Sequence, residues 1–474
     1  MVQIPILNGI TADASRPDFR TAYPLNMVPV PKSQGISEGY LRPAEGIVTL
    51  NSAAPGPDRG GVVWNGIAYR VMGTKLCAVT LSGSISILGD VGGTDYVCMD
   101  YSFDRLGFAS GNRLWYSTGG APFSVSDGDV GAVKDAMFIA GYWMFTDGEF
   151  IGVTDLSDPL SVNPLRYGSS EVDPDPIVAL KRIRDEAYAV NRYSIEGFRN
   201  VGGTGFPWQV IQGSQIMRGA VGRTAVCVFE SALAFVGSGR DEGVSVYLGD
   251  NGDSAPIASR EIEQILEQYT EEQLAQIVLE PRSMRAHKLL YLHLPDQTLV
   301  YDATASLAVE EPGWHILRSS AEPGQCLVRG FSLVDNRWIA GDPANSRYGL
   351  LSQEVMTHWG EPVQWEFCVP ALYNDGNPAI IHELELVALP GRVALGADPV
   401  IWTSSSQDGV VWTGERSIKA GKIGDRTKRL VWLQQGIVNN WRTQRFRGTS
   451  DAPLSFARLE ARIEPLNRKR GNAG

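Results

Sequence analysis

Histidine and cysteine are the side chains best able to hold a metal or act as nucleophiles, and their spacing in this chain argues against both roles. The histidines never stand at metal-ligand spacing, and neither a His-Glu-x-x-His nor a Cys-x-x-Cys motif occurs. A Gly-x-Ser-x-Gly nucleophile motif is also missing. The sequence therefore predicts no catalytic residue, no metal site and no cofactor. The histidines are His287, His293, His315, His358 and His382.

Two short runs look like ligand-binding loops but lack essential residues. Gly421-Lys422 is followed by Ile423 and has no glycine five positions earlier, so it is not a phosphate-binding loop. The run from Asp250 to Asp253 begins like a calcium loop, yet the later ligands and the bidentate glutamate are missing. We expect the second run to be a surface turn.

The run from Ser406 to Trp412, SQDGVVW, approximates the Asp box of sialidase-like propellers. That box is a folding device in which Asp and Ser hold a turn above a packed Trp, and it carries no catalytic group. A glycosidase would need two carboxylates at a fixed separation, which one sequence cannot place in space. A carbohydrate-binding or glycoside-hydrolysing β-propeller therefore stays the alternative function.

Composition indicates a multidomain β protein. The chain has 474 residues, of which 43% are hydrophobic and 20% charged, with 52 Gly and 27 Pro. This length predicts two or three domains, and the turn-forming residues favour β structure. The net charge of −11 should repel a polyphosphate backbone, so the chain is not expected to bind DNA tightly.

Cysteine usage and the N-terminus indicate where the protein is made. The cysteines are odd in number and mostly lie in apolar runs, which predicts buried free thiols formed in a reducing cytoplasm. The N-terminus has no basic and apolar leader, and no stretch of 18 apolar residues occurs, so we expect no secretion signal and no membrane insertion. The cysteines are Cys77, Cys98, Cys227, Cys326 and Cys368.

A repeated hairpin pattern, an apolar strand, a polar turn and a second apolar strand, is the main evidence on the fold. The hairpins are spaced roughly 35 to 55 residues apart, enough for one four-stranded propeller blade each. The pattern predicts a β-propeller of six or seven blades, with a β-sandwich array or a stack of meanders as alternatives. The seven hairpins pair 66–71 with 75–79, 105–109 with 113–116, 142–145 with 149–153, 186–190 with 194–198, 233–236 with 244–248, 288–294 with 298–302 and 337–340 with 348–351.

A helical hairpin is predicted to interrupt the β series near residues 259–280. Ser259 can cap a first helix, and Thr270 to Gln273 form a capping box for a second. The hairpin could cover the propeller rim or contact another subunit.

Three regions follow from these patterns. Residues 1–55 are rich in Pro and Asn and predict an extended N-terminal arm, and residues 56–355 hold the propeller with its insert. Residues 356–474 predict a C-terminal β-sandwich with a basic tail at 467–472, which is either solvated or in contact with DNA or a partner. The predicted sandwich strands are 364–370, 382–389, 399–404, 410–412, 429–434, 443–447 and 454–463.

Residues 254–303, and more weakly the chain over roughly residues 20–355, follow the residue order and spacing of a known family. These segments resemble the hub or packaged-DNA stabilisation proteins of short-tailed bacteriophages. The C-terminal region matches only in length and strand texture. The residues of this resemblance to which we assign a structural or assembly role are Pro256, Ile257, Ala258, Ile262, Ile265, Tyr269, Thr270, Tyr301 and Asp302.

The resemblance implies a structural subunit of the virion tail rather than an enzyme. Such a subunit forms a ring, expected to be a hexamer, below the portal adaptor, where it retains packaged DNA and extends the ejection channel. It receives the tail needle or plug and helps to anchor tailspikes. The acidic balance is consistent with this function, because every phosphate gripped by Lys or Arg would hold DNA in the channel.

Overall fold

The structure is a computed structural model that describes residues 1–7, 9–12, 19–32, 37–156, 158–285, 287–369, 377–439, 441–449 and 451–466. The chain forms two compact units, one of residues 49–295 and 327–351 and the other of residues 1–48, 296–326 and 352–474. Within the described ranges, no helix has the length and apolar character needed to cross a membrane. The predicted basic tail at 467–472 lies outside the described residues.

Antiparallel sheets follow one another along the chain, and the first four have four strands each in sequence order. The first comprises β7 (Asp58–Trp64), β8 (Ile67–Met72), β9 (Lys75–Val79) and β10 (Ile85–Asp90). The second comprises β11 (Met99–Tyr101), β12 (Leu106–Ser110), β13 (Arg113–Ser117) and β14 (Phe123–Ser124). The third comprises β15 (Asp135–Ile139), β16 (Tyr142–Thr146), β17 (Ile151–Asp155) and β18 (Asp158–Gly168). The fourth comprises β19 (Ile177–Ile183), β20 (Glu186–Asn191), β21 (Ile195–Asn200) and β22 (Trp208–Val210).

Three further sheets complete the series, and the last takes a strand from near the N-terminus. The fifth has β23 (Gly219–Ala220), β24 (Val226–Phe229), β25 (Ala232–Ser238), β26 (Ser245–Asp250) and β27 (Asp253–Pro256). The sixth has β28 (Val278–Met284), β29 (His287–His293), β30 (Thr298–Asp302) and β31 (Trp314–Leu317). The seventh has β32 (Arg329–Val334), β33 (Arg337–Gly341), β34 (Tyr348–Ser352) and then β6 (Gly46–Asn51), followed by β35 (Thr357–His358) and β36 (Glu361–Pro362).

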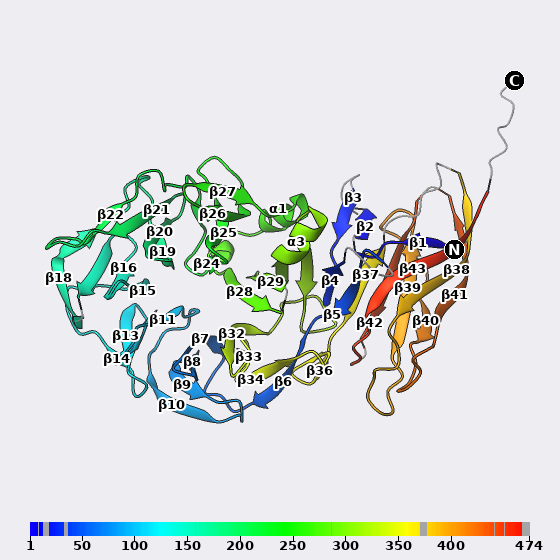
Figure 1. Cartoon of the computed structure of the whole chain (residues 1–474), viewed down its shortest axis with the longest axis horizontal. Helices are drawn as coiled ribbons and strands as arrows, with labels where there is room; N and C mark the ends of the chain where they lie inside the picture. The colour runs from blue at the N-terminus through cyan, green and yellow to red at the C-terminus, as the bar shows by residue number, and fades with distance from the viewer. Residues whose placement is uncertain are drawn as a thin grey trace, which may run out of the picture. The chain divides into compact units, whose positions relative to one another are not determined.

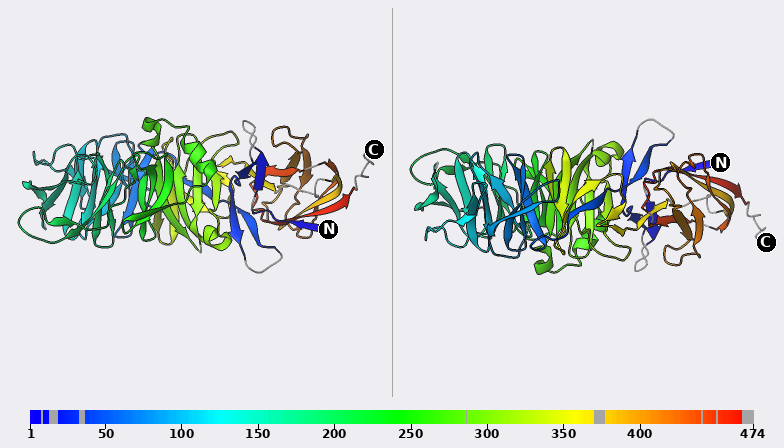
Figure 2. Two further views of the ribbon diagram at one scale, coloured as in Figure 1. Left: turned by 90° about the horizontal axis from the view of Figure 1, so that it is seen from above. Right: turned by 90° about the horizontal axis from the view of Figure 1, so that it is seen from below.

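The propeller prediction is confirmed, and the described residues form seven such sheets. The sheets of the 49–295 and 327–351 unit stand around a common centre (Figure 1), and their strands run across the thickness of this ring (Figure 2). Each predicted hairpin forms two adjacent inner strands of one sheet, for example β16 and β17. All five residues of β16 are buried, because a middle strand packs against neighbouring sheets on both faces.

The helical insert is also confirmed, but its two helices are short, with 7 and 4 residues. Helix α1 (Arg260–Leu266) has Ser259 as N-cap, and α2 (Glu271–Leu274) carries the capping box of Thr270 and Gln273. A third helix, α3 (Ala303–Val309), was not predicted from the sequence and is capped by Asp302.

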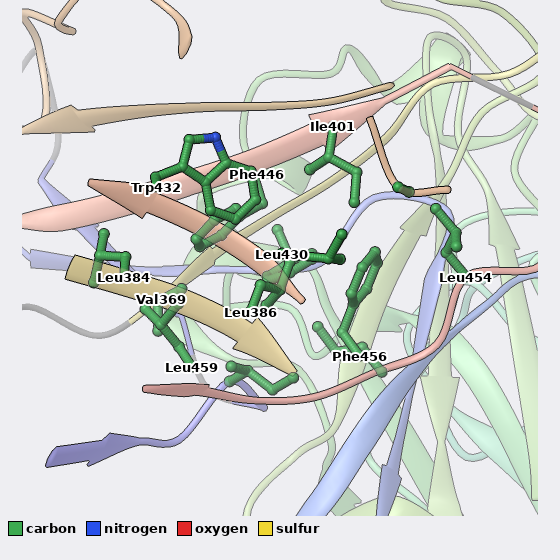
Figure 3. Close-up of a cluster of buried hydrophobic side chains, with 14 of the residues drawn as sticks. Val369, Leu384, Leu386, Ile401, Leu430, Trp432, Phe446, Leu454, Phe456 and Leu459 are labelled. Carbon is green, nitrogen blue, oxygen red and sulfur yellow. The ribbon is translucent and has the colours of Figure 1, made fainter. Parts of the chain in front are cut away.

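The C-terminal region is a β-sandwich, as predicted. One sheet has the order β4 (Met27–Pro31), β5 (Gly39–Pro43), β43 (Phe456–Pro465), β38 (Ala379–Ala388) and β41 (Leu430–Val438), with β1 (Val2–Ile4) also on β43. The other has the order β37 (Trp365–Val369), β42 (Thr443–Gly448), β39 (Val400–Ser406) and β40 (Arg416–Lys419). Figure 3 shows side chains of both sheets, among them Leu384, Trp432 and Phe446, meeting in one buried core. Strands β2 (Gly9–Ala12) and β3 (Phe19–Ala22) form a separate hairpin.

One predicted strand of the sandwich is wrong, and one observed strand was not predicted. Residues 410–412 belong to the Asp-box turn, where Ser406 and Trp412 make only an isolated bridge. Asp408 Oδ1 accepts hydrogen bonds from the backbone N–H groups of Val410 and Val411, at 2.9 and 2.8 Å, which holds these residues in a turn. The strand that follows this turn is β40.

Candidate functional site

The propeller unit encloses a cavity of about 470 Å³ at the inner strands of its sheets. Its polar lining is the first place to look for chemistry, because pockets with convergent charged groups are the default candidates for active sites. The ionisable residues that line it are Tyr96, Cys98, Asp100, Asp135, Lys181, Arg182, Cys227 and Glu280.

Two aspartates of this cavity each connect one sheet to the next. Asp100 of β11 accepts a hydrogen bond from the Phe138 N–H on β15, at 2.8 Å. Asp135 of β15 accepts one from the Leu180 N–H on β19, at 3.0 Å, and lies 3.2 Å from Lys181 Nζ. A carboxylate that accepts a backbone N–H stabilises buried polar groups at the junction of two sheets. These side chains therefore act as clasps between sheets.

Glu280, which is 6% exposed, makes a third clasp from this cavity. Its Oε1 accepts a hydrogen bond from Gly330 N–H on the next sheet, at 2.8 Å, and another from the Tyr96 hydroxyl. Burial alone raises the pKa of Glu280, but hydrogen bonds from His293, Tyr96 and Gly330 outweigh it and hold this pKa below its ordinary value. A glycosidase acid needs the opposite shift, so Glu280 is set up as an acceptor.

A buried ion pair within the first sheet holds Arg70 against the seventh sheet. Arg70 Nε lies 2.6 Å from Asp58 Oδ2, and both side chains are at most 1% exposed. Arg70 also donates to the Gly330 carbonyl, at 2.7 Å, and to Ser332 Oγ, at 3.2 Å. Gly330 has a φ of +68°, and a Cβ at this position would collide with Arg70 Nη2. The pair thus fastens the first blade to the last one.

A Ser–His pair in the other unit has the chemistry of a nucleophile and base but no access for a substrate. Ser319 Oγ lies 2.7 Å from His358 Nδ1. Both residues are less than 8% exposed, and the cavity beside His358 measures only about 10 Å³. Burial lowers the pKa of His358 to about 4. A neutral, enclosed imidazole of this kind is a packing group.

The cysteines are free thiols, as predicted. Four of them are buried, and Cys98 is half-buried. Burial raises the pKa of Cys77 to about 12 and that of Cys368 likewise to about 12, which leaves these thiols protonated and unreactive. Among the described residues, no group of three or more His, Cys, Asp or Glu could hold a metal ion.

Comparison with known proteins identifies the family. A family model described as Bacteriophage P22 Gp10, beta-propeller, matches residues 2–356, and one described as Bacteriophage P22 Gp10, beta-sandwich, matches residues 364–464. The chain belongs to the bacteriophage P22 Gp10 family. This confirms the resemblance to tail hub proteins and extends it to the C-terminal sandwich, where the sequence alone showed only similar length and strand texture.

One curated relative matches 98% of the chain, and solved structures match smaller parts of it. The tail hub protein gp10 of Salmonella phage P22 is 28% identical over 485 residues, which cover 98% of this chain and 99% of that protein. Among solved structures, the N-terminal domain of Nup159 is 8% identical with a TM-score of 0.42, covering 68% of this chain and 97% of that one. The Neurospora crassa Pan2 WD40 domain is 10% identical with a TM-score of 0.42, covering 64% of this chain and 94% of that one.

Residues 256–270 of the predicted family motif take packing and capping positions. Pro256 ends β27 opposite Tyr247, and the N–H of buried Ile257 donates to the Val246 carbonyl, at 2.9 Å. Thr270 caps α2, and Ile262 is fully buried on α1. Ala258, Ile265 and Tyr269 are half-buried around the same helices.

The last two motif residues organise the start of α3. Tyr301 packs on Trp314, with ring centroids 5.3 Å apart. Asp302 is 1% exposed and accepts hydrogen bonds from the N–H groups of Thr304 and Ala305, at 3.0 and 3.1 Å. These positions account for a structural role in the Gp10 fold, and an assembly role for the nine residues stays a prediction.

Sequence reasoning missed the clasp carboxylates. Asp100 and Asp135 stand in short strands with no motif around them, and their partners are backbone groups about 40 residues later. The available signal was an acidic residue in an otherwise apolar inner strand, as in Asp135 to Ile139, because a buried acid requires a partner.

Proposed function

We propose that this protein is a tail hub: a non-enzymatic subunit that forms a ring below the portal adaptor, retains packaged DNA and forms part of the ejection channel. Membership of the Gp10 family across both domains makes it a structural component of a phage tail. The observation that carries the proposal is the full-length match to a tail hub protein, over 98% of this chain.

The use of the cavity carboxylates supports a role without catalysis. Asp100, Asp135 and Glu280 each accept a backbone N–H from the next sheet, so each of these carboxylates takes part in holding the propeller together. Hydrolysis of glycosides, the alternative predicted from the propeller, needs one acid with a raised pKa opposite a second carboxylate. The pKa of Glu280 is shifted the other way.

The charge of the chain supports contact with DNA that is weak and independent of base sequence. With 53 acidic and 42 basic residues, the net charge is −11. An acidic wall grips few phosphates, so DNA can slide past it when it is ejected. Retention then rests on closing the channel rather than on binding the DNA.

Partners and domain roles belong to the same proposal. We propose a homo-oligomer, with a hexameric ring as the working model, that contacts the portal adaptor, the tail needle or plug, and tailspikes. The chain is made in the bacterial host cytoplasm and ends in the virion tail. We propose a division into a propeller at 56–355 and a sandwich at 356–474, and the family matches, which end at 356 and begin at 364, support the boundary between them. Residues 1–55, predicted as an extended arm, contribute β1, β4 and β5 to a sheet of the sandwich and β6 to the seventh sheet.

Retention of DNA can be tested on phage heads assembled without this protein. Such heads should package DNA and then lose it, and added purified protein should keep the DNA nuclease-resistant. Bovine serum albumin at the same concentration serves as the control. If heads that lack the protein hold their DNA as firmly as complete virions, the retention role is wrong.

A further inference from the structure

A second hollow on the propeller unit has a different character from the central cavity. It is an open groove of about 410 Å³, formed at the ends of inner strands of the first four sheets, and its walls alternate aromatic and hydrogen-bonding side chains. The lining residues are Val63, Trp64, Asn65, Tyr101, Ser102, Phe103, Phe138 and Arg182.

Phe103 is presented to solvent by a rigid turn. Its side chain is 98% exposed, the largest value for any large apolar residue in the described ranges. The turn around it is closed by the bond from Ser102 N–H to the Arg105 carbonyl, at 2.8 Å, and by Ser102 Oγ donating to Asp104 Oδ1, at 2.7 Å. Trp64 Nε1 donates to the Ser102 carbonyl, at 3.1 Å. These bonds fix the backbone of the turn, so Phe103 is carried at a set position at the edge of the groove.

Asp100 positions the groove residues Tyr101, Phe138 and Arg182. Its Oδ1 accepts from Tyr101 N–H, at 2.8 Å, and its Oδ2 from Phe138 N–H, at 2.8 Å. Arg182 donates to the Phe138 carbonyl and lies 3.6 Å from Asp100 Oδ1, with its side chain 39% exposed. The guanidinium thus has a set position and still offers N–H donors to the groove.

We propose that this groove binds a saccharide. Sugar rings carry an apolar C–H face that stacks on exposed aromatic rings, and hydroxyls that pair with planar side chains of the Arg and Asn type. Phe103 and Tyr101, which is 46% exposed, supply the rings. Arg182 and Asn65 supply the hydrogen-bonding groups, and the volume of the groove suits one or two sugar units.

The groove is a binding site without a hydrolytic centre. None of its eight lining residues is a carboxylate, so it lacks the pair of acids that glycoside cleavage requires. The inference does not depend on ring formation or on DNA retention.

An array of defined neutral and acidic bacterial oligosaccharides, printed beside a random peptide library, tests the proposal on the full-length protein. We expect binding to one class of oligosaccharide, with weakening of about tenfold in Phe103→Ala, as for loss of a central aromatic contact. Tyr167→Ala, which removes another exposed ring of the same unit outside the groove, should bind within about twofold of the unchanged protein.

Stability separates loss of binding from loss of folding. Because Phe103 is 98% exposed, Phe103→Ala should melt at the same temperature as the unchanged protein. The proposal is overturned if no oligosaccharide binds, if peptides bind and sugars do not, or if Phe103→Ala and Tyr167→Ala bind sugar equally well.

Discussion

Three buried acidic residues of the propeller take part in the junctions between blades: two accept from the neighbouring sheet, and the third pairs with an arginine of its own sheet that donates to the neighbouring one. Asp135 and Glu280 accept backbone N–H groups, while Asp58 faces Arg70. An unpaired buried carboxylate costs several kcal/mol, so each acid also specifies which strand must lie beside it. The acidic residues that were the first candidates for catalysis thus connect neighbouring sheets of the propeller.

Removing one member of the buried pair should open the junction of the first and seventh sheets. We expect Asp58→Ala to lower the free energy of unfolding by about 3–5 kcal/mol, because the Arg70 charge stays buried without its partner. Urea unfolding followed by tryptophan fluorescence measures this. Asp90→Ala, which breaks the exposed pair with Lys75 on the same sheet, should leave the urea midpoint nearly unchanged. Equal midpoints for the two variants would contradict the clasp.

His358 should make the protein less stable in mild acid. Its pKa is about 4 in the folded chain and about 6.5 when unfolded, so the unfolded state binds the extra proton between these values. Stability is full above pH 6.5 and falls as the pH drops toward 4, by about 3 kcal/mol in total. His358→Asn should flatten this dependence in urea titrations at pH 7 and pH 5. The exposed His382→Asn is the control and should keep the slope.

For single residues, the sequence predicted roles that involve neighbours in the chain and missed roles that involve residues far away in the chain. Ser259 and Thr270 were expected as helix caps, because a cap bonds to backbone only three residues away. The clasps of Asp100 and Glu280 reach residues that are 38 and 50 positions later, and no local pattern marks such a partner.

Among the secondary-structure elements too, the sequence predicted those with a strong local pattern and missed the others. The middle hairpins of the blades were predicted because their turns are short and their strands are continuous apolar runs, as in β16. Outer strands such as β14, two residues long, carry too little pattern to be seen. The valines at 410 and 411 mimicked a strand, although the Asp408 carboxylate turns the chain there.

Pairing between the two ends of the chain was outside what sequence could predict. Residues 1–55 were expected as an extended arm, and in the structure β1 lies on β43 with Ile4 opposite Leu459. Ile4 is 5% exposed and belongs to the core of the sandwich. A contact between residues more than 450 positions apart in the chain leaves no periodic pattern in either segment.

Strand β1 should be needed for the sandwich. Ile4→Asp places a carboxylate in its core and should cost about 3 kcal/mol, with faster amide hydrogen exchange at residues 459–461 of β43. Val2→Asp is the matched control on the same strand, since Val2 is 53% exposed. Exchange that is slow in both variants would show that β1 does not stabilise β43.

The whole molecule joins a propeller and a sandwich in one chain of the Gp10 family. Its buried acidic residues stabilise the fold, and its net charge is negative. A structural role in the phage tail does not require the protein to act on a substrate. We propose that interfaces with other tail proteins carry the function, and that assembly sets the copy number and the surface that faces the DNA.

Negative-stain microscopy of the purified protein mixed with its portal–adaptor complex tests the central claim most directly. The tail hub account predicts a ring of density at the distal end of the adaptor, and its absence when the protein is omitted. Protein that stays monomeric and never docks on the adaptor would contradict the account.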